Sequence, residues 1–299
     1  MRTFPATTGL WMLLGCAGLF AQTSAPPSPV VGVGTFIHVV ADLDKTMRFY
    51  GDLLGLERTG APGPRAFATN AVVEGLYDAK GSESRVAAFK IPGSPMGLEF
   101  VEFKGVSQRP FRAGPGDAGA SIVSIPVRDL DSVNAKLSRD TVTNRGGIVQ
   151  DPDGFFIKLV DGGSPASLRL IVDNTGRTVQ MFRELLGFQP LAFGDGPSVM
   201  DTAKMDTAKI PGTDFIVRFD SSGKGPAPAS THDPAIHDPG AGVLRLIVRD
   251  VDALLETLKA AGVPVASAGG EPVKVGGRNF VIMRDPDGFF FQLAPQPVR

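Results

Sequence analysis

The sequence predicts an α+β protein built from a repeated strand-and-helix unit, and three observations support this fold class. At four places in the 299-residue chain, 39–43, 127–130, 171–174 and 248–251, an apolar strand ends on Asp or Asn and an amphipathic helix follows. Two of the helices end in the same Leu-Leu-Gly tripeptide, and two units share an Asp-Pro-Asp-Gly-Phe-Phe ending. The period is too long for a short-repeat solenoid. Sheets covered by helices on one side leave their opposite, concave faces for ligands.

Each predicted helix follows a capping residue whose side-chain oxygen can accept backbone N–H groups, and each carries one apolar stripe. The capping residues are Asp42, Asp129, Asn174 and Asp250. The stripes are Leu43, Met47, Tyr50 and Leu54; Leu130, Val133 and Leu137; Val179, Phe182 and Leu186; and Val251, Leu254, Leu255 and Leu258. Gly55, Gly187 and Gly262 are suited to close three of these helices.

Strand candidates follow each helix. After the first and third helices they are 85–91 with 98–103, and 215–219; after the second and fourth they are 146–150 with 155–160, and 280–284 with 289–293. The two Asp-Pro-Asp-Gly sequences are predicted hairpin turns, because Pro presets φ and Gly permits a positive φ. The stretch before the first of these turns is shorter than the one before the second. The second unit therefore lacks about a strand, which is expected to open its cavity.

Residues 1–21 have the features of an export signal. Arg2 precedes an apolar stretch, 10–20, that is too short to span a bilayer, and cleavage is expected near Ala21. Lipid attachment at Cys16, or retention as an uncleaved anchor, is the less favoured alternative. Cys16 is the only cysteine, so the mature chain is expected to have neither disulfides nor a thiol nucleophile. The predicted location is the periplasm or the medium, with no membrane span in the mature chain.

The length and charge of the chain limit its organisation and its partners. We expect a flexible leader at 22–33, a first domain at 34–161 with a shortened second half, and a second domain at 166–296. The 30 Lys and Arg residues nearly balance the 31 Asp and Glu residues. This balance gives no electrostatic footprint for nucleic acid or an anionic membrane. A small molecule is the expected partner.

Several short motifs carry a resemblance to a known superfamily: Phe49-Tyr50, Leu53-Leu54-Gly55-Leu56, Leu98-Glu99-Phe100 and the two Asp-Pro-Asp-Gly turns. They resemble the vicinal oxygen chelate superfamily, which includes glyoxalase I, bleomycin-resistance proteins, methylmalonyl-CoA epimerase and extradiol dioxygenases. The resemblance covers about 34–296 and implies two tandem domains of paired βαβββ modules. It does not select a function, because the superfamily contains lyases, isomerases, dioxygenases and binding proteins.

The resemblance also identifies the positions at which metal-dependent members bind a divalent ion. A His usually lies seven residues before the capping residue, and a Glu or His lies on the last strand of the module. The positions seven residues before the four capping residues are Thr35, Ile122, Ser167 and Val243. The last-strand positions include Glu99 and Lys158 in the first domain and Gln292 in the second. Because a lysine beside Glu99 would repel a divalent ion, no metal cofactor is predicted.

Histidines leave a metal-dependent alternative open. Without gaps, His38 faces away from the metal positions and is a packed structural residue. If the strand is instead three residues shorter than in metal-binding relatives, His38 takes the position of the family's histidine. His38 and Glu99 then become the ligands of a metal-dependent lyase, isomerase or dioxygenase. Glu99 is otherwise a pocket residue paired with Lys158. His232 and His237 alternate with carboxylates in a Pro-rich loop that could complete a metal site, although a solvated loop is the favoured interpretation.

Two arginines suggest an anion site. Arg169 and Arg245 each lie two residues after the position of the family's histidine, so both are expected to face the cavity of the second domain. Together with the neutral Gln292, they predict binding of a carboxylate-bearing or phosphate-bearing small molecule. A slip in register would turn both arginines outward.

The resulting hypothesis is an exported protein that binds a small organic molecule without a catalytic metal. A weaker alternative is a structural module that packs against another protein. The sequence specifies neither the ligand nor the oligomeric state.

Overall fold

The computed structural model describes residues 27–60, 66–111, 114–139, 144–145, 147–173, 175–191, 207–222 and 234–297. The expected signal at 1–21 lies outside these residues, as do Asn174 and His232. The first strand already begins at Val30, so the expected leader at 22–33 extends too far. No helix in the described ranges is long and apolar enough to cross a membrane.

The chain forms four consecutive modules of strands and helices. The first contains β1 (Val30–Val40), α1 (Leu43–Met47), η1 (Arg48–Leu53), β2 (Arg58–Thr59), β3 (Ala68–Thr69), α2 (Ala71–Leu76), β4 (Glu83–Lys90) and β5 (Gly97–Lys104). The second contains β6 (Ser121–Val127), α3 (Leu130–Arg139), β7 (Asn144–Arg145), β8 (Ile148–Gln150) and β9 (Phe156–Asp161).

The third and fourth modules follow the same plan. The third contains β10 (Ser167–Val172), α4 (Thr175–Gln180), η2 (Met181–Leu185), β11 (Gln189–Pro190), β12 (Thr207–Lys209) and β13 (Ile216–Ser221). The fourth contains β14 (Gly242–Val248), α5 (Val251–Ala260), η3 (Ala268–Gly270), β15 (Val273–Val275), β16 (Arg278–Arg284) and β17 (Phe290–Pro295). The α+β class and all four expected helices are confirmed.

Local sequence explains where the helices begin and end. The Asp42 carboxylate accepts the backbone N–H of Lys45 at 3.0 Å, and Asp250 does the same for Ala253 at the start of α5. Gly55 and Gly187 have φ values of 72° and 73° after η1 and η2. This left-handed conformation is available to glycine at little cost, which is why Leu-Leu-Gly ends both helices.

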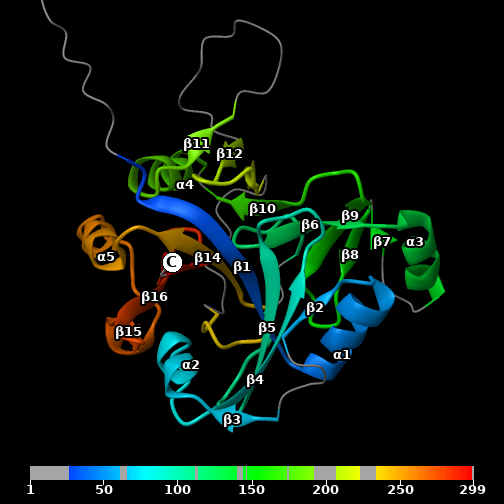
Figure 1. The fold of residues 1–299 in the computed structure, drawn as a ribbon, viewed down its shortest axis with the longest axis horizontal. Coiled ribbons are helices and arrows are strands. Elements are labelled where there is room, and N and C mark those ends of the chain that lie inside the picture. The colour runs from blue at the N-terminus through cyan, green and yellow to red at the C-terminus, as the bar shows by residue number, and fades with distance from the viewer. Residues whose placement is uncertain are drawn as a thin grey trace, which may run out of the picture.

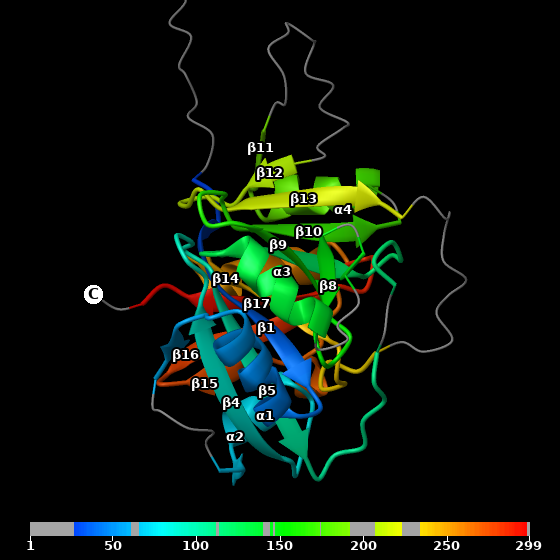
Figure 2. The same cartoon turned by 90° about the vertical axis from the view of Figure 1, so that its right-hand side faces the viewer.

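Two mixed sheets organise the modules (Figure 1). Sheet A has the order β15-β16-β17-β14-β1-β5-β4-β2, with β3 paired to β4, and sheet B has the order β11-β12-β13-β10-β6-β9-β8-β7. Sheet A therefore joins the first module to the fourth, through antiparallel pairing of β1 with β14, and sheet B joins the second to the third. Figure 2 shows β10 and β13 of sheet B above β1, β4 and β5 of sheet A.

This pairing corrects the expected domain boundaries, 34–161 and 166–296, because neither sheet is continuous in sequence. The lengths of the links give the physical reason. The link 162–166 between β9 and β10 is short and stays within sheet B. The links 105–120 and 222–241 are several times longer, and each has the reach to carry the chain from one sheet to the other.

The two Asp-Pro-Asp-Gly turns join the sheets. Each is a hairpin turn, as predicted, between β8 and β9 or between β16 and β17. Asp153 accepts the backbone N–H of Ala41 at 2.7 Å and the Thr46 hydroxyl at 3.1 Å. A turn of sheet B therefore holds the start of α1, the helix that follows strand β1 of sheet A. Asp287 binds Asp173 and Thr178 in the reciprocal arrangement. A large apolar core fills the space between the sheets and under the helices.

Candidate functional site

Three of the predicted site residues lie together on one face of sheet A. Glu99 is on β5 opposite Ile37 of β1, and Gln292 is on β17 opposite Arg245 of β14. Alternation along the strands turns these side chains away from α1 and α5, toward the side of the sheet on which α2 packs. We call this side the α2 face; it includes Thr35, Ile37, Glu99, Val243, Arg245 and Gln292.

Arg245 links the two polar partners on this face. Its Nε donates to Gln292 Oε1 at 2.6 Å, and its two terminal nitrogens donate to the two Glu99 oxygens, each at 3.2 Å. The guanidinium therefore makes a planar, bidentate contact with Glu99, the strongest geometry for this kind of pair. Gln292 is buried, whereas the side chains of Arg245 and Glu99 are 26% and 20% exposed, so the ion pair remains accessible.

Gly34 makes room for this arrangement. A Cβ atom at position 34 would lie 2.9 Å from Cδ of Arg245, a separation that real Cβ atoms essentially never show. The aliphatic part of Arg245 therefore crosses the β1 backbone where no side chain is present. Gly32, two residues earlier, faces Ile247 with a less severe approach of 3.4 Å. Gly34 and Gly32 both belong to strand β1, where the missing side chains leave room for Arg245 and Ile247.

Two buried hydroxyls border the ion pair. Tyr77 follows α2, and its ring packs on Phe103 of β5 at a centroid distance of 5.3 Å. Burial raises the pKa of Tyr77 above its ordinary value, the Glu99 charge raises it further, and the Arg245 charge lowers it. The hydroxyls of Tyr77 and Thr35 are both buried, and neither has a hydrogen-bond partner within the described ranges. Buried hydroxyls without partners are costly and commonly mark a place that a ligand or water completes.

A groove reaches the edge of this face. It has a free volume of about 710 Å³ and is lined by Thr35, Ala88, Gly97 and the loop 91–96, among others. Ala88 pairs with Glu99 in the sheet, although neither Glu99 nor Arg245 lines the groove. Its size lies within the ~300–1,000 Å³ typical of small-molecule sites.

The residues of the α2 face do not fit a divalent metal. The four positions at which relatives carry ligands hold Thr35, Glu99, Val243 and Gln292, and the Arg245 guanidinium already binds Glu99 and Gln292. A divalent ion would have to replace this guanidinium or remain beside its positive charge. Elsewhere in the described part of the chain, no group of three or more His, Cys, Asp or Glu side chains is arranged to hold a metal ion.

His38 lies on the opposite face of sheet A from Glu99. It pairs with Phe100 in the register, and its ring packs on Phe155 at 4.6 Å. Its Nδ1 lies 3.3 Å from the Ala241 carbonyl oxygen, and its Nε2 lies 3.6 Å from Asp151 Oδ2. Burial lowers the pKa of His38 to about 4. His38 is thus a packed residue between the sheets, and the alternative that joins it to Glu99 in one metal site is wrong.

Sheet B holds the other predicted site residues, so they do not join Arg245 and Glu99. Arg169 is on β10, and its Nε lies 3.1 Å from Asp220 Oδ2. The expectation that Arg169 and Arg245 converge in one cavity is therefore wrong, because their modules build different sheets. Lys158 is on β9 of sheet B, so it does not pair with Glu99.

The histidine loop packs beside the α2 face. His237 Nδ1 lies 3.0 Å from the Tyr77 carbonyl oxygen, and the neighbouring Ile236 is buried in the apolar cluster that covers this face. The loop thus holds Tyr77 in place, and His232 lies outside the described residues. The sequence patterns do not identify Tyr77 as a neighbour of the Arg245–Glu99 ion pair. The available signal was that Tyr77 is one of only two tyrosines in the chain.

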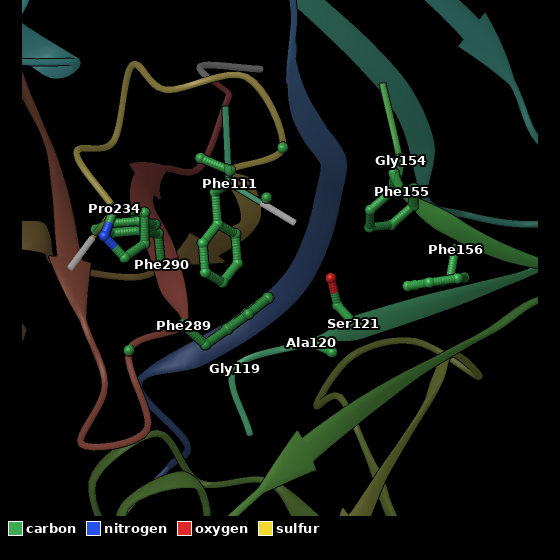
Figure 3. Close-up of a pocket in the computed structure, with 14 residues that line it drawn as sticks. Phe111, Gly119, Ala120, Ser121, Gly154, Phe155, Phe156, Pro234, Phe289 and Phe290 are labelled. Atoms are coloured by element: carbon green, nitrogen blue, oxygen red, sulfur yellow. The ribbon is translucent and has the colours of Figure 1, made fainter. Parts of the chain in front are cut away.

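A second, smaller cavity lies where the two hairpin turns meet (Figure 3). Equivalent residues of the second and fourth modules line it in pairs: Ala120 and Ala241, Gly154 and Gly288, Phe155 and Phe289, and Phe156 and Phe290. Its free volume is about 30 Å³, which is enough to hold water. This cavity is too small for an organic ligand.

Comparisons with known proteins agree with this architecture. A family model described as the Glyoxalase/Bleomycin resistance protein/Dioxygenase superfamily matches residues 164–293. The structure of a putative dioxygenase from Bacillus subtilis is 14% identical in sequence with a TM-score of 0.52, and the match covers 91% of this chain and 87% of the dioxygenase chain. The structure of glyoxalase I from Zea mays is 16% identical in sequence with a TM-score of 0.54, and the match covers 88% of this chain and 91% of the glyoxalase chain. No curated protein sequence matches the chain significantly.

Proposed function

Because residues 164–293 belong to the glyoxalase, bleomycin-resistance and dioxygenase superfamily and the described chain has its fold, we propose that this protein binds a small organic molecule without a catalytic metal. The proposed site is the α2 face of sheet A. The observation that carries the proposal is the Arg245 guanidinium, which bridges Glu99 and Gln292 at the positions of the family's metal ligands.

The chemistry of the face indicates the kind of ligand that it accepts. Arg245 and Glu99 balance each other in charge, and Gln292 and Thr35 are neutral. A polar group of the ligand can therefore exchange hydrogen bonds with the ion pair and the buried hydroxyls. Ile37, Val243 and Phe290 are buried in the apolar cluster of this face and make the surroundings of the ion pair apolar. A polar molecule of low net charge with an apolar body suits this surface better than a polyanion does.

A ligand screen tests this proposal. Thermal shifts of the purified protein are measured against a panel of neutral, zwitterionic and acidic metabolites, and compared with those of Arg245→Met and Glu99→Gln. We expect at least one compound to stabilise the wild type and to lose most of its effect in both variants. Lys259→Met on α5, which changes an exposed cation far from this face, is the matched control. If no compound acts, or if the variants respond like the wild type, the proposal is wrong.

Metal independence has its own test. Protein incubated with zinc, nickel, manganese or iron(II) and then desalted is expected to retain far less than one equivalent by elemental analysis. One tight equivalent that disappears in Glu99→Gln would overturn this part of the proposal.

We propose further that the protein is exported and loses residues 1–21, on the basis of Arg2 and the apolar stretch 10–20. The intact mass of protein recovered from the periplasm or the medium is expected to match a chain beginning near Gln22. An added mass of a lipid on a chain that begins at Cys16 would instead indicate an anchored protein.

A further inference from the structure

Helix α2 packs on a module to which it does not belong. Residues 70–82, which we call the α2 flap, leave the first module after β3 and return to it at β4. Their helix packs against β15, β16 and η3 of the fourth module, toward the opposite edge of sheet A from β4. Figure 1 shows α2 between β3 and β15. The flap therefore crosses the α2 face from one side of the sheet to the other.

The base of the flap is at one place on the sheet. Thr69 of β3 pairs with Glu83 of β4, so the residue before the flap and the residue after it are neighbours in the sheet. Within the flap, Glu74 Oε2 accepts the backbone N–H of Gly81 at 2.7 Å, which joins the helix to its own return turn. The flap is thus a self-contained unit with its base at β4 and its far side on β15.

Apolar contact holds the far side of the flap on the strands of the fourth module. A Cβ atom at Gly75 would lie 2.9 Å from Cγ2 of Val273, so this close approach requires glycine. No hydrogen bond or ion pair joins 71–76 to β15, β16 or η3, all of which belong to the described ranges. His237, in the loop before β14, adds a polar contact of 3.0 Å with the Tyr77 carbonyl oxygen. A segment held by so few contacts can open locally while the sheet stays intact.

The flap covers the apolar part of the proposed ligand site. Leu76 is buried in the same apolar cluster as Ile37 and Ile282, which lie on the α2 face beside Glu99 and Gln292 in the register. The side chain of Glu99 is partly exposed, whereas Ile37 and Ile282 are fully buried. A ligand can therefore reach the polar part of the face, but its apolar body has no access to the surface beneath the flap.

We propose that the α2 flap is a gate that lifts from β15 to admit the apolar body of a ligand to the α2 face and then closes over it. This inference rests on the proposed function, because the ligand is the one bound beside Arg245 and Glu99. Lifting separates Gly75 from Val273 and leaves the strand pairs of sheet A in place. Closing returns the buried Tyr77 hydroxyl, which has no partner in the described structure, to a position where a ligand can accept its hydrogen bond.

Two reporter cysteines on β16 measure the opening without a ligand, in a chain from Gln22 onward that contains no native cysteine. Ile282 and Met283 are both 0% exposed, but Ile282 lies in the cluster beneath the flap and Met283 lies in the main core on the other side of the sheet. We expect Ile282→Cys to react with iodoacetamide about tenfold or more faster than Met283→Cys, because only its thiol is exposed when the flap lifts. Equal rates would show that both thiols need global unfolding and would overturn the proposal.

A variant of the polar contact adds an internal control. His237→Ala removes the contact with the Tyr77 carbonyl oxygen, so it is expected to raise the reaction rate of Ile282→Cys and to leave that of Met283→Cys unchanged. An equal rise at both positions would show a loss of overall stability rather than a movement of the flap.

A disulfide identifies the flap as the element that moves. A Cβ atom at Gly75 would lie 3.9 Å from Cβ of Val273, within the ~3.5–4.5 Å usual for disulfides. In Gly75→Cys with Val273→Cys, hydrogen exchange of the amides of 71–77 is expected to slow about tenfold or more after oxidation and to recover after reduction. Amides of β10 in sheet B are the control. If oxidation forms the disulfide and leaves exchange in 71–77 unchanged, the flap does not open at this contact and the proposal is wrong.

The gate and the ligand site fail separately. The thiol and exchange measurements contain no ligand, so they test the gate whatever the ligand screen yields. For a compound that the screen identifies, the oxidised disulfide variant is expected to bind about tenfold or more slowly than the reduced variant in stopped-flow measurements. Equal association rates would overturn the gate and leave the proposed site in place.

Discussion

The Tyr50 hydroxyl donates a hydrogen bond of 3.0 Å to Oδ2 of Asp151, although the modules of the two residues build different sheets. The residue that matches Tyr50 in the third module is Phe182, which has no hydroxyl. Oδ2 of Asp285, the residue that matches Asp151, is buried and has no hydrogen-bond partner within the described ranges. The two turns therefore join the sheets with similar backbone geometry but unequal hydrogen bonding.

The two tyrosines are expected to respond differently to the same change. Tyr50→Phe removes a buried hydrogen bond and leaves a carboxylate oxygen without its donor, so we expect a loss of about 1–3 kcal/mol in the free energy of unfolding. Tyr77→Phe removes a hydroxyl that has no partner in the described structure, so we expect a change close to zero or a small gain. Urea unfolding of both variants measures the difference.

Equal losses in Tyr50→Phe and Tyr77→Phe would contradict this assignment of the two hydroxyls. Tyr77→Phe also serves the ligand screen, because it removes a buried hydroxyl beside Glu99 while retaining the ring that packs on Phe103.

Asp285 is expected to make stability depend on pH. Burial raises the pKa of Asp285 from 3.8 to about 7, despite the backbone N–H groups that it accepts. Between these two values the folded state holds a proton that the unfolded state releases, so the free energy of unfolding falls as pH rises from about 4 to about 7. The slope from this one group is at most ~1.4 kcal/mol per pH unit.

Comparison with Asp285→Asn isolates this contribution, because Asn can still accept the N–H groups of Asp287 and Phe289. The variant is expected to gain stability relative to the wild type between about pH 5 and about pH 7, and the difference should be constant above about pH 8. His38, whose lowered pKa has the opposite effect, is present in both proteins and cancels. A stability difference between the two proteins that does not change with pH would contradict the raised pKa of Asp285.

Arg245 and Glu99 are expected to be energetically coupled. In a double-mutant cycle with Arg245→Met and Glu99→Gln, we expect a coupling of about 1 kcal/mol in the free energy of unfolding, measured by urea titration. The estimate is modest because both side chains are partly exposed. Raising the salt concentration should reduce the coupling. Additive single effects would show that the ion pair contributes nothing to stability.

Gly34 is expected to be less tolerant of substitution than Gly32. Gly34→Ala forces Arg245 to move and should cost about 1–3 kcal/mol of stability, as overpacking does, whereas Gly32→Ala should cost less because its contact is longer. Thermal unfolding compares the two variants. Shortening the partner in Gly34→Ala with Arg245→Ala should recover part of the loss. If it recovers nothing, the cost of Gly34→Ala does not arise from the crossing of Arg245.

The elements of the fold could be predicted from sequence because their signals are local. A capping Asp, an apolar stripe and a closing glycine fix α1 with η1 and α5, and Pro and Gly fix the two hairpin turns. The pairing of modules depends on contacts between residues far apart in the chain. It could not be inferred from a pattern that all four modules share. The Asp161-Gly162-Gly163-Ser164-Pro165 sequence, which has no helix or strand pattern, was the basis for the expected boundary between 161 and 166, but it lies at a short connection inside sheet B.

The site was predictable to the same extent. The resemblance picks out Glu99 and Gln292, and counting from the caps picks out Arg245; all three lie on one face of sheet A. That this face binds a ligand stays a prediction. The mutual contacts of these three residues, and the separation of Arg169 and Lys158 from them, follow from the pairing of modules. Tyr77 could not be placed from sequence alone, since it follows a short helix that none of the repeat signals predicts.

The pairing of the first module with the fourth, and of the second with the third, also determines the order in which the sheets can form. Sheet B joins neighbouring modules and can form while the chain is still being synthesised. Strand β1 is among the first segments to emerge, yet its partner β14 lies in the last module. Until that module arrives, β1 presents an unpaired edge that is open to aggregation. Sheet A contains the most distant contacts in the chain, so its closure is expected to be the slow step of folding.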